Sequence, residues 1–256
     1  MNLEPGSVWL VGAGPGDPGL LTLHAAHALA EAEVVVHDAL VSPEILALAP
    51  QARLEAAGKR AGGDRVPQLR INERLIGLAR DGLRVVRLKG GDPLVFGRGG
   101  EEALALAAAG IPFRIVPGIS AGIGGTAAAG IPVTHRGLAR SVAFVTGHDT
   151  TGALPELNWA ALSRGAEVLV LYMGLRQIGA ITARLLAAGR DGVDPVVFVT
   201  EATTARQHVV MTTLADAADI ARTIPKHLPT LIVIGPVVAL RPLLAACQPE
   251  GERHVA

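Results

Sequence analysis

The feature that most constrains this chain is the regular alternation of short apolar runs with longer helical patterns. Val8–Val11 is the first apolar run, and an Ala-rich helical pattern at Leu20–Ala32 separates it from the next run, which begins at Val34. Apolar runs that alternate with helices are typical of βαβ units, in which neighbouring strands are parallel. The sequence therefore predicts an α/β protein.

The same alternation continues along the chain and forms two groups of strands. The strands expected in the first half are Val8–Val11, Val34–His37, Arg53–Ala56, Arg84–Leu88 and Phe113–Val116. Those expected in the second half are Ser141–Thr146, Glu167–Tyr172, Pro195–Thr200, Gln207–Met211 and Thr230–Ile234. The connection before Gln207 is short, so this strand is expected to pair antiparallel with its predecessor. We expect two α/β domains, 1–117 with a parallel sheet and 118–246 with a mixed sheet, followed by a tail at 247–256.

Helices are expected between these strands. The expected segments are Pro43–Leu48, Pro67–Arg80, Gly99–Ala109, Ile119–Ala129, Trp159–Arg164, Gln177–Ala188 and Ala215–Thr223. In Pro67–Arg80, the apolar residues Leu69, Leu75, Ile76 and Ala79 are expected to share the buried face.

Charge and cysteine content exclude several classes of protein. Lys plus Arg number 23 and Asp plus Glu number 23, which argues against nonspecific nucleic-acid binding. Cys247 is the single cysteine, so a disulfide within the chain and a cysteine-rich metal site are both excluded. The N-terminus lacks a signal pattern, and apolar stretches such as Leu231–Leu240 are broken by Gly and Pro. We expect a soluble cytoplasmic protein that binds neither a membrane nor a metal.

The loop after the first strand is rich in glycine and proline. Gly14, Gly16 and Gly19 satisfy the GxGxxG spacing of dinucleotide-binding folds. Pro15 and Pro18 lie within the same loop and remove amide donors that a phosphate would use. This spacing alone leaves two interpretations open, which are a nicotinamide oxidoreductase and a tight strand–helix turn without a ligand.

Three further loops with polar residues follow the next strands. They contain His37-Asp38, Gly58-Lys59-Arg60 and Lys89-Gly90-Gly91-Asp92. The carboxyl ends of parallel strands lie at one edge of a sheet, where ligand crevices form. We therefore expect these loops to converge on one site, although a single Asp at a strand end is commonly a helix cap.

Basic residues accumulate in segments that could bind carboxylates. They are Lys59, Arg60, Arg98, His135, Arg136 and Arg140, and arginine binds carboxylates through paired hydrogen bonds. Taken one at a time, each is better explained as a solvated surface charge. Glu101 and Glu102 open a helix, and we interpret both as residues that complement the helix dipole. His24 and His27 lack a third metal ligand.

Together these segments resemble the uroporphyrinogen-III C-methyltransferases, a group within the tetrapyrrole methylase family. The resemblance runs in order from about Val8 to Leu243. Its segments are GAGPGDP at 12–18, DALVS at 38–42, GKRAG at 58–62, VVRLKGGDP at 85–93, FGRGGEE at 96–102, VPGIS at 116–120, GIPVTHR at 130–136 and YMG at 172–174. It implies the two-domain tetrapyrrole methylase fold with the methyl donor bound between the domains, and it overrules the dinucleotide interpretation.

The resemblance also implies an activity. Members of this group use S-adenosylmethionine to methylate uroporphyrinogen III at carbons 2 and 7, through precorrin-1, and release precorrin-2 and S-adenosylhomocysteine. The product feeds sirohaem and cobalamin synthesis. The chain resembles the stand-alone form, which is a homodimer. Two alternatives stay open: a related methylase that acts on a later corrin intermediate, and a noncatalytic tetrapyrrole carrier.

Residues that match the family's functional positions are implied in the same way. Asp38 matches the proposed proton acceptor and Lys59 the proposed proton donor. The donor-binding positions correspond to Pro15, Gly90, Gly91, Asp92, Val95, Ser120, Ala121, Met173 and Ala202. The chain departs from the family at Ala202, where relatives have glycine, and at Gly63-Asp64, where His or Tyr is frequent. The substrate's carboxylates are expected to meet Arg60, Arg98, His135, Arg136 and Arg140.

Overall fold

A computed structural model describes residues 2–57, 67–149 and 151–246. The chain divides into two compact units, Met1–Ser120 (unit 1) and Ala121–Ala256 (unit 2). Each unit is an α/β domain, as the alternating pattern predicts. Lys59, Arg60, the Gly63-Asp64 segment and the tail predicted at 247–256 lie outside the described residues.

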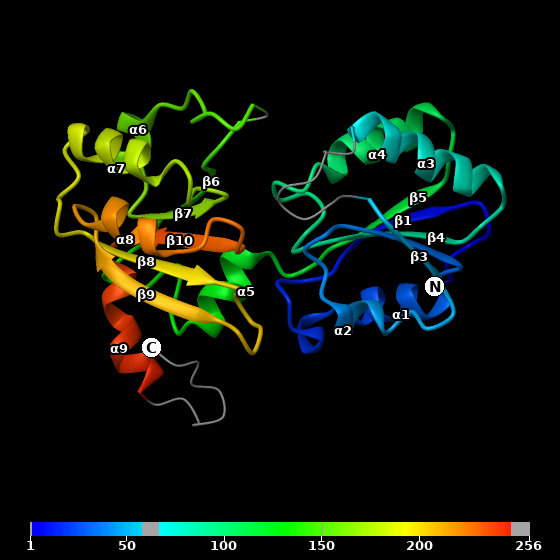
Figure 1. Cartoon of the computed structure of the whole chain (residues 1–256), viewed down its shortest axis with the longest axis horizontal. Coiled ribbons are helices and arrows are strands. Elements are labelled where there is room, and N and C mark those ends of the chain that lie inside the picture. Colours follow the sequence, from blue (N-terminus) through cyan, green and yellow to red (C-terminus); the bar gives the residue numbers. More distant parts are fainter. Residues whose placement is uncertain (1, 58–66, 150, 247–256) are drawn as a thin grey trace. The chain divides into compact units, whose positions relative to one another are not determined.

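The described part of unit 1 holds a five-stranded parallel sheet (Figure 1). Its strands are β1 (Val8–Gly12), β2 (Val34–His37), β3 (Arg53–Ala56), β4 (Val85–Lys89) and β5 (Phe113–Val116), in the order β3-β2-β4-β1-β5. All of the pairings are parallel, which confirms the predicted sheet. The carboxyl ends of its strands therefore share one edge.

Helices cover both faces of this sheet. Figure 1 shows α1 (Leu23–Glu31) and α2 (Pro43–Leu46) on one face, and α3 (Gln68–Arg80) and α4 (Gly99–Ala108) on the other. Alternate strand residues fill the two cores: Val11, Val35 and Leu88 pack towards α1 and α2, whereas Leu10 and Val36 pack towards α3 and α4. The two-residue period of each strand thus decides which helices its side chains meet.

Two local predictions in unit 1 need correction. A 3₁₀ turn at Pro18–Leu20 precedes α1, which starts only at Leu23 because Thr22 caps the Ala25 amide at 3.1 Å. The buried face of α3 consists of Ile71, Leu75, Leu78 and Ala79. Leu69 is 67% exposed, because it lies about 240° around the helix from Leu75.

The described part of unit 2 holds a mixed five-stranded sheet. Its strands are β6 (Val142–Thr146), β7 (Val168–Tyr172), β8 (Pro195–Thr200), β9 (His208–Thr213) and β10 (Thr230–Ile234), in the order β6-β7-β10-β8-β9. β9 pairs antiparallel with β8, as the short connection predicts. β10 is also antiparallel to both of its neighbours, whereas β6 and β7 are parallel.

Helices also cover both faces of the second sheet. α6 (Trp159–Gly165), α7 (Ile178–Ala187) and α8 (Ala217–Thr223) pack on one face. α5 (Ala121–Ala128) packs on the other, where a 3₁₀ turn at Pro236–Leu240 also contributes to the core (Figure 1). The sequence pattern missed α9 (Arg241–Ala245), a single short turn of helix. Nowhere in the described ranges is a helix both long and apolar enough to cross a bilayer.

Candidate active site

The carboxyl ends of the unit 1 strands bring together the loops that the sequence singles out. Gly12 is in register with Lys89, and His37 is in register with Leu88, so β1, β2 and β4 end side by side. Asp38 follows β2 and its backbone amide donates to the Leu88 carbonyl at 3.1 Å. This edge therefore carries both the Asp38 loop and the Gly90–Asp92 segment.

Close backbone packing explains the glycines of these loops. Gly14 and Gly91 donate backbone hydrogen bonds to one another's carbonyl oxygens at 3.1 and 2.7 Å. A Cβ on Gly118 would lie only 2.2 Å from the Gly91 carbonyl oxygen. The Gly19 amide donates to the Asp17 carboxylate at 2.7 Å. Because the Gly14 and Gly19 amides already have acceptors, the GxGxxG spacing here reflects tight backbone contact rather than a pyrophosphate cradle.

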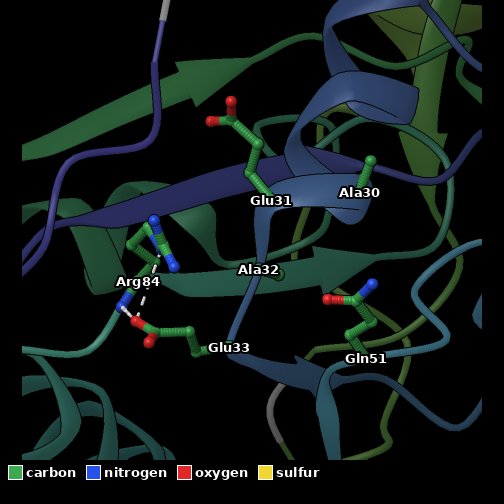
Figure 2. Close-up of a pocket in the computed structure, with 6 residues that line it drawn as sticks. All are labelled: Ala30, Glu31, Ala32, Glu33, Gln51 and Arg84. Atoms are coloured by element: carbon green, nitrogen blue, oxygen red, sulfur yellow. Dashed lines mark hydrogen bonds and ion pairs between the residues drawn. The ribbon is translucent and has the colours of Figure 1, made fainter.

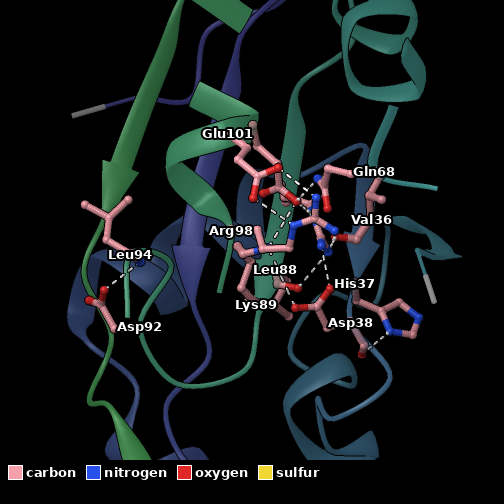
Figure 3. A network of polar contacts seen from close by, with 12 residues as sticks. Val36, His37, Asp38, Gln68, Leu88, Lys89, Asp92, Leu94, Arg98 and Glu101 are labelled. Carbon is pink, nitrogen blue, oxygen red and sulfur yellow. Dashed lines mark hydrogen bonds and ion pairs between the residues drawn. The ribbon is translucent and has the colours of Figure 1, made fainter. Parts of the chain in front are cut away.

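The Asp92 side chain holds the loop that follows β4. Its Oδ1 accepts from the Leu94 amide at 2.8 Å (Figure 3). Its Oδ2 accepts from the Gly118 amide at 3.1 Å. Both carboxylate oxygens thus fix backbone segments, one within the loop and one after β5. Gly90 and Gly91 precede it without side chains, so a flat ligand can approach the backbone there.

Asp38 lies at the exposed end of a buried ionic network. Arg87 and Lys89 are two residues apart in β4, so both side chains point towards the α3 and α4 face of the sheet. Arg87 Nη2 donates a hydrogen bond of 2.5 Å to Asp38 Oδ1, and Lys89 Nζ lies 3.8 Å from Asp38 Oδ2 (Figure 3). The two cations are 2% exposed, whereas the Asp38 side chain is 33% exposed. Asp38 is therefore the member of the network that solvent, or a ligand, reaches.

Glu102 closes the network on its buried side. Its carboxylate is completely buried, and Oε1 accepts from Arg87 Nε at 3.1 Å and from Lys89 Nζ at 3.0 Å. Gln68 of α3 donates to the same oxygen at 3.0 Å. Interpreting Glu102 as a helix-dipole residue is therefore incomplete, because its carboxylate forms ion pairs with two buried cations. Glu101, by contrast, is exposed and binds Arg98.

Burial and charge act on Lys89 in opposite directions. Burial, and secondly the neighbouring Arg87 guanidinium, lower the pKa of Lys89 below its usual 10.5, while Asp38 and Glu102 raise it. The net effect is a lowered pKa, so the Lys89 ammonium is easier to deprotonate than that of an exposed lysine.

Arg87, Glu102 and Gln68 were not predicted as site residues, and Lys89 was predicted only as part of its loop. A signal was available, because two basic residues two positions apart in a buried strand must point to the same side. Charged side chains are almost never fully buried unless they are paired, so that pattern predicts a buried carboxylate opposite them. Which helix supplies it follows from the packing, which the spacing does not encode.

In unit 2, the residues predicted to bind the donor lie at three segment ends: the start of α5, the end of β7 and the end of β8. Met173 follows β7 with φ 56°, an uncommon left-handed conformation for a residue with a side chain. Gly147 packs so closely there that a Cβ on it would lie 2.2 Å from Gly174 Cα. Ala121 is the first residue of α5. Met173 is 43% exposed and therefore available to a ligand.

The alanine at position 202 is accommodated within unit 2. Ala202 follows β8, and a Cβ on Gly125 of α5 would lie 2.9 Å from the Ala202 methyl. The absence of a side chain at Gly125 therefore makes room for the methyl group of Ala202.

The predicted basic residues occupy different surroundings. Arg98 has a left-handed backbone (φ 60°), and its guanidinium pairs with the Glu101 carboxylate at 2.8 and 2.7 Å. His135, Arg136 and Arg140 lie on one exposed loop of unit 2, closed by backbone hydrogen bonds between His135 and Ala139. Lys59 and Arg60 are outside the described residues.

A polar cavity of about 350 Å³ lies at the amino edge of the unit 1 sheet (Figure 2). Glu33 and Arg84 precede β2 and β4, and the Glu33 carboxylate accepts from the Arg84 amide at 2.8 Å. This edge is opposite the one that carries Asp38. The cavity is therefore separate from the candidate site.

A family model for "Tetrapyrrole (Corrin/Porphyrin) Methylases" matches residues 7–218, most of the chain. The chain belongs to the tetrapyrrole methylase family. This membership confirms the expected family and enzyme class. The match covers all of the strand-end loops described above in unit 1, and in unit 2 it extends past Met173 and Ala202.

Named relatives of this methylase agree with that assignment. It is 59% identical over 245 residues to a uroporphyrinogen-III C-methyltransferase of Sinorhizobium sp., covering 94% of this chain and 87% of the relative. It is 52% identical to siroheme synthase 2 of Aeromonas hydrophila, covering 94% of this chain but 51% of that longer relative.

Solved structures confirm the expected fold. Uroporphyrin-III C-methyl transferase from Thermus thermophilus, complexed with S-adenyl homocysteine, matches with a TM-score of 0.80 and 42% identity, covering 91% of this methylase and 99% of that chain. A cobalt precorrin-4 methyltransferase matches with a TM-score of 0.78 and 26% identity, covering 90% and 95% of the two chains.

Proposed function

We propose that this methylase transfers methyl groups from S-adenosylmethionine to carbons 2 and 7 of uroporphyrinogen III, through precorrin-1, to give precorrin-2. The observation that carries the proposal is the 59% identity with a relative named for this reaction. The S-adenosyl homocysteine bound to the Thermus relative supports the choice of donor. The strand-end loops of unit 1 supply a backbone surface and a partly exposed carboxylate that suit such a reaction.

The donor's contribution is an electrophilic methyl group on a sulfonium. In unit 1 we assign its binding to Pro15, Gly90, Gly91, Asp92, Val95 and Ser120, and in unit 2 to Ala121, Met173 and Ala202. The side-chain-free backbone at Gly90 and Gly91 supports this assignment, because it lets a flat group lie against the chain. Asp92 supports it indirectly, because its hydrogen bonds to Leu94 and Gly118 fix the loop.

Asp38 is the proposed proton acceptor. A pyrrole carbon of the macrocycle is electron-rich and forms the bond to the methyl group as the carbon–sulfur bond breaks. No covalent intermediate with the protein is needed, and most of the catalytic effect comes from alignment. The methylated macrocycle then loses a proton, which the Asp38 carboxylate accepts. Lys59 is the proposed proton donor.

Basic residues are proposed to bind the eight carboxylates of the substrate. Arg60 and Arg98 in unit 1, and His135, Arg136 and Arg140 in unit 2, are the candidates. Exposure of the 135–140 loop supports the proposal for unit 2. Arg98 would exchange its Glu101 partner for a substrate carboxylate.

A cytoplasmic homodimer is the proposed form, without nucleic-acid or membrane partners. Exposed apolar side chains of unit 2 support self-association, among them Ile123, Leu243 and Leu244. Because precorrin-2 is a precursor of both sirohaem and cobalamin, either pathway is open to the product.

The test is anaerobic incubation with uroporphyrinogen III and labelled S-adenosylmethionine, followed by mass spectrometry that counts the methyl groups added. We expect two. A second candidate, methylation of a later corrin intermediate, is favoured by the fold match to cobalt precorrin-4 methyltransferase. Labelling of a corrin substrate but not of uroporphyrinogen III would support that candidate and contradict the first.

An active-site variant tests the role of Asp38 separately. We expect Asp38→Asn to slow turnover about 100-fold, in the range of general base catalysis, while affinity for S-adenosylhomocysteine is kept. Wild-type turnover in this variant would remove the assignment of Asp38 as the base without contradicting the overall reaction.

A further inference from the structure

The buried carboxylate of Glu102 has no part in the function proposed so far. Three donors converge on its Oε1, from Arg87, Lys89 and Gln68 at 3.0–3.1 Å. Its Oε2 is also buried and accepts no hydrogen bond from the part of the chain that the structure describes. A buried carboxylate that uses one oxygen in this way is stabilised mainly by its two cations.

Arg87 connects this buried carboxylate to the exposed one. Its Nε donates to Glu102, whereas its Nη2 donates to Asp38, so one guanidinium bridges the two acids. Lys89 Nζ lies 3.0 Å from Glu102 and 3.8 Å from Asp38. The orientation of the Asp38 carboxylate therefore depends on two cations whose own positions depend on Glu102.

We propose that Glu102 is a positioning residue for methyl transfer: it anchors Arg87 and Lys89, and through them it holds the Asp38 carboxylate at the carboxyl edge of the unit 1 sheet. The inference rests on the proposed function, which gives Asp38 the proton-accepting role. Arg87 and Lys89 are the intermediaries.

Removal of the Glu102 charge changes the network in two ways. Arg87 loses the charged partner of its Nε, so at most a weaker bond to a neutral amide oxygen remains, and the guanidinium can turn away from Asp38. Lys89 loses an anion that raises its pKa, so the ammonium deprotonates at a lower pH. Among the described residues, the charged groups that interact with Lys89 are Arg87 on the same strand, Asp38 after β2, and Glu101 and Glu102 on α4. From α3 comes the uncharged Gln68 amide, which donates to Glu102.

The test is Glu102→Gln, which keeps the shape of the side chain and removes its charge. We expect kcat at neutral pH to fall about 10- to 100-fold, as misplacement of a catalytic group does, with the donor KM within about twofold of wild type. We also expect the alkaline limb of the kcat–pH profile to move to lower pH. Glu33→Gln is the matched control, because Glu33 pairs with Arg84 at the opposite edge of the same sheet. It should leave kcat and the profile unchanged.

A second variant covers the possibility that Glu102→Gln leaves too much uncompensated charge to fold. Glu102→Gln combined with Lys89→Met removes one anion and one cation together. Thermal unfolding with and without S-adenosylhomocysteine establishes that it is folded. We expect its kcat to remain reduced about tenfold or more, because Arg87 still lacks the negative charge that anchors it.

Either variant overturns the inference if it is folded and has wild-type kcat. A lower melting temperature with an unchanged pH profile in Glu102→Gln also overturns it, because that result indicates a purely structural role. Failure of the premise is distinguishable. Wild-type turnover of Asp38→Asn would remove the role of Asp38 as the base, and absence of methylation of uroporphyrinogen III would contradict the proposed reaction.

Discussion

The Tyr172 hydroxyl accepts a hydrogen bond of 2.7 Å from the Gly122 backbone amide. This bond joins the end of β7 to the first turn of α5. The ring packs edge-on against Phe144, and a Cβ on Gly122 would lie 2.3 Å from the hydroxyl oxygen. Within unit 2, the bond therefore fixes Met173 relative to Ala121, two residues that we propose to bind the donor.

We expect Tyr172→Phe to weaken S-adenosylhomocysteine binding about fivefold, which corresponds to one hydrogen bond of about 1 kcal/mol. The kcat should change less than the donor KM, because the bond orders a binding segment. Isothermal titration calorimetry and steady-state kinetics measure the two effects. An unchanged dissociation constant would show that the bond does not order the donor site.

Asp92→Asn is expected to reduce both stability and donor affinity. The amide group of Asn retains one acceptor oxygen, so either the Leu94 or the Gly118 amide loses its partner. The expected loss is about 1–2 kcal/mol of the free energy of unfolding, measured in urea.

Asp191→Asn is the control for Asp92→Asn, because the Asp191 carboxylate makes a similar bond to the Val193 amide in an exposed turn. It should lower stability slightly and leave donor affinity unchanged. If Asp92→Asn binds S-adenosylhomocysteine as tightly as wild type in calorimetry, Asp92 does not shape the donor site.

Two glycine substitutions should have opposite effects. Gly118→Ala places a methyl group 2.2 Å from the Gly91 carbonyl oxygen, so the loops at the sheet edge must shift. We expect a loss of about 3 kcal/mol or more, at the upper end of the range for overpacking, because the contact is with backbone atoms. Gly77 lies in α3 near its C-terminal end, and a Cβ added there would meet no atom within 4 Å, so Gly77→Ala should instead stabilise unit 1 by up to about 1 kcal/mol. Urea unfolding of both variants tests the contrast, and equal effects would contradict it.

A pH-dependent contribution is expected from Glu55. Its hydrogen bond with Arg74 lowers the pKa of Glu55 below 4.5. A lowered folded-state pKa stabilises the protein above pH 4.5, and the contribution is lost as the pH falls through the lowered value. Glu55→Gln should therefore be less stable than wild type by about 0.5–1 kcal/mol at neutral pH. The difference should vanish in acid, and a difference independent of pH would contradict the assignment.

The architecture could be predicted from the sequence because local runs of apolar residues indicate most of the strands. Even the antiparallel pairing of β9 with β8 follows from the short connection between them. Leu69 was misplaced because helical spacing defines a face only to within a residue or two, whereas Leu75 and Ala79 are buried as predicted.

The candidate site was predicted only in part. Asp38 and the Gly90–Asp92 segment could be found because they directly follow strands whose ends can be recognised in the sequence, and ligands bind at the carboxyl ends of parallel strands. Glu102 could not, because its partners Arg87 and Lys89 lie 15 and 13 residues away and meet it only when α4 packs on the sheet. Long-range charge pairing depends on tertiary packing, which local patterns do not specify.

The most direct test of the central claim, that the carboxyl edge of the unit 1 sheet binds the methyl donor, is a crystal structure with S-adenosylhomocysteine bound. We expect the ligand to contact the backbone of Gly90–Asp92, with Asp38 still held by Arg87. A ligand bound elsewhere, for example in the polar cavity beside Glu33 and Arg84, would contradict the claim.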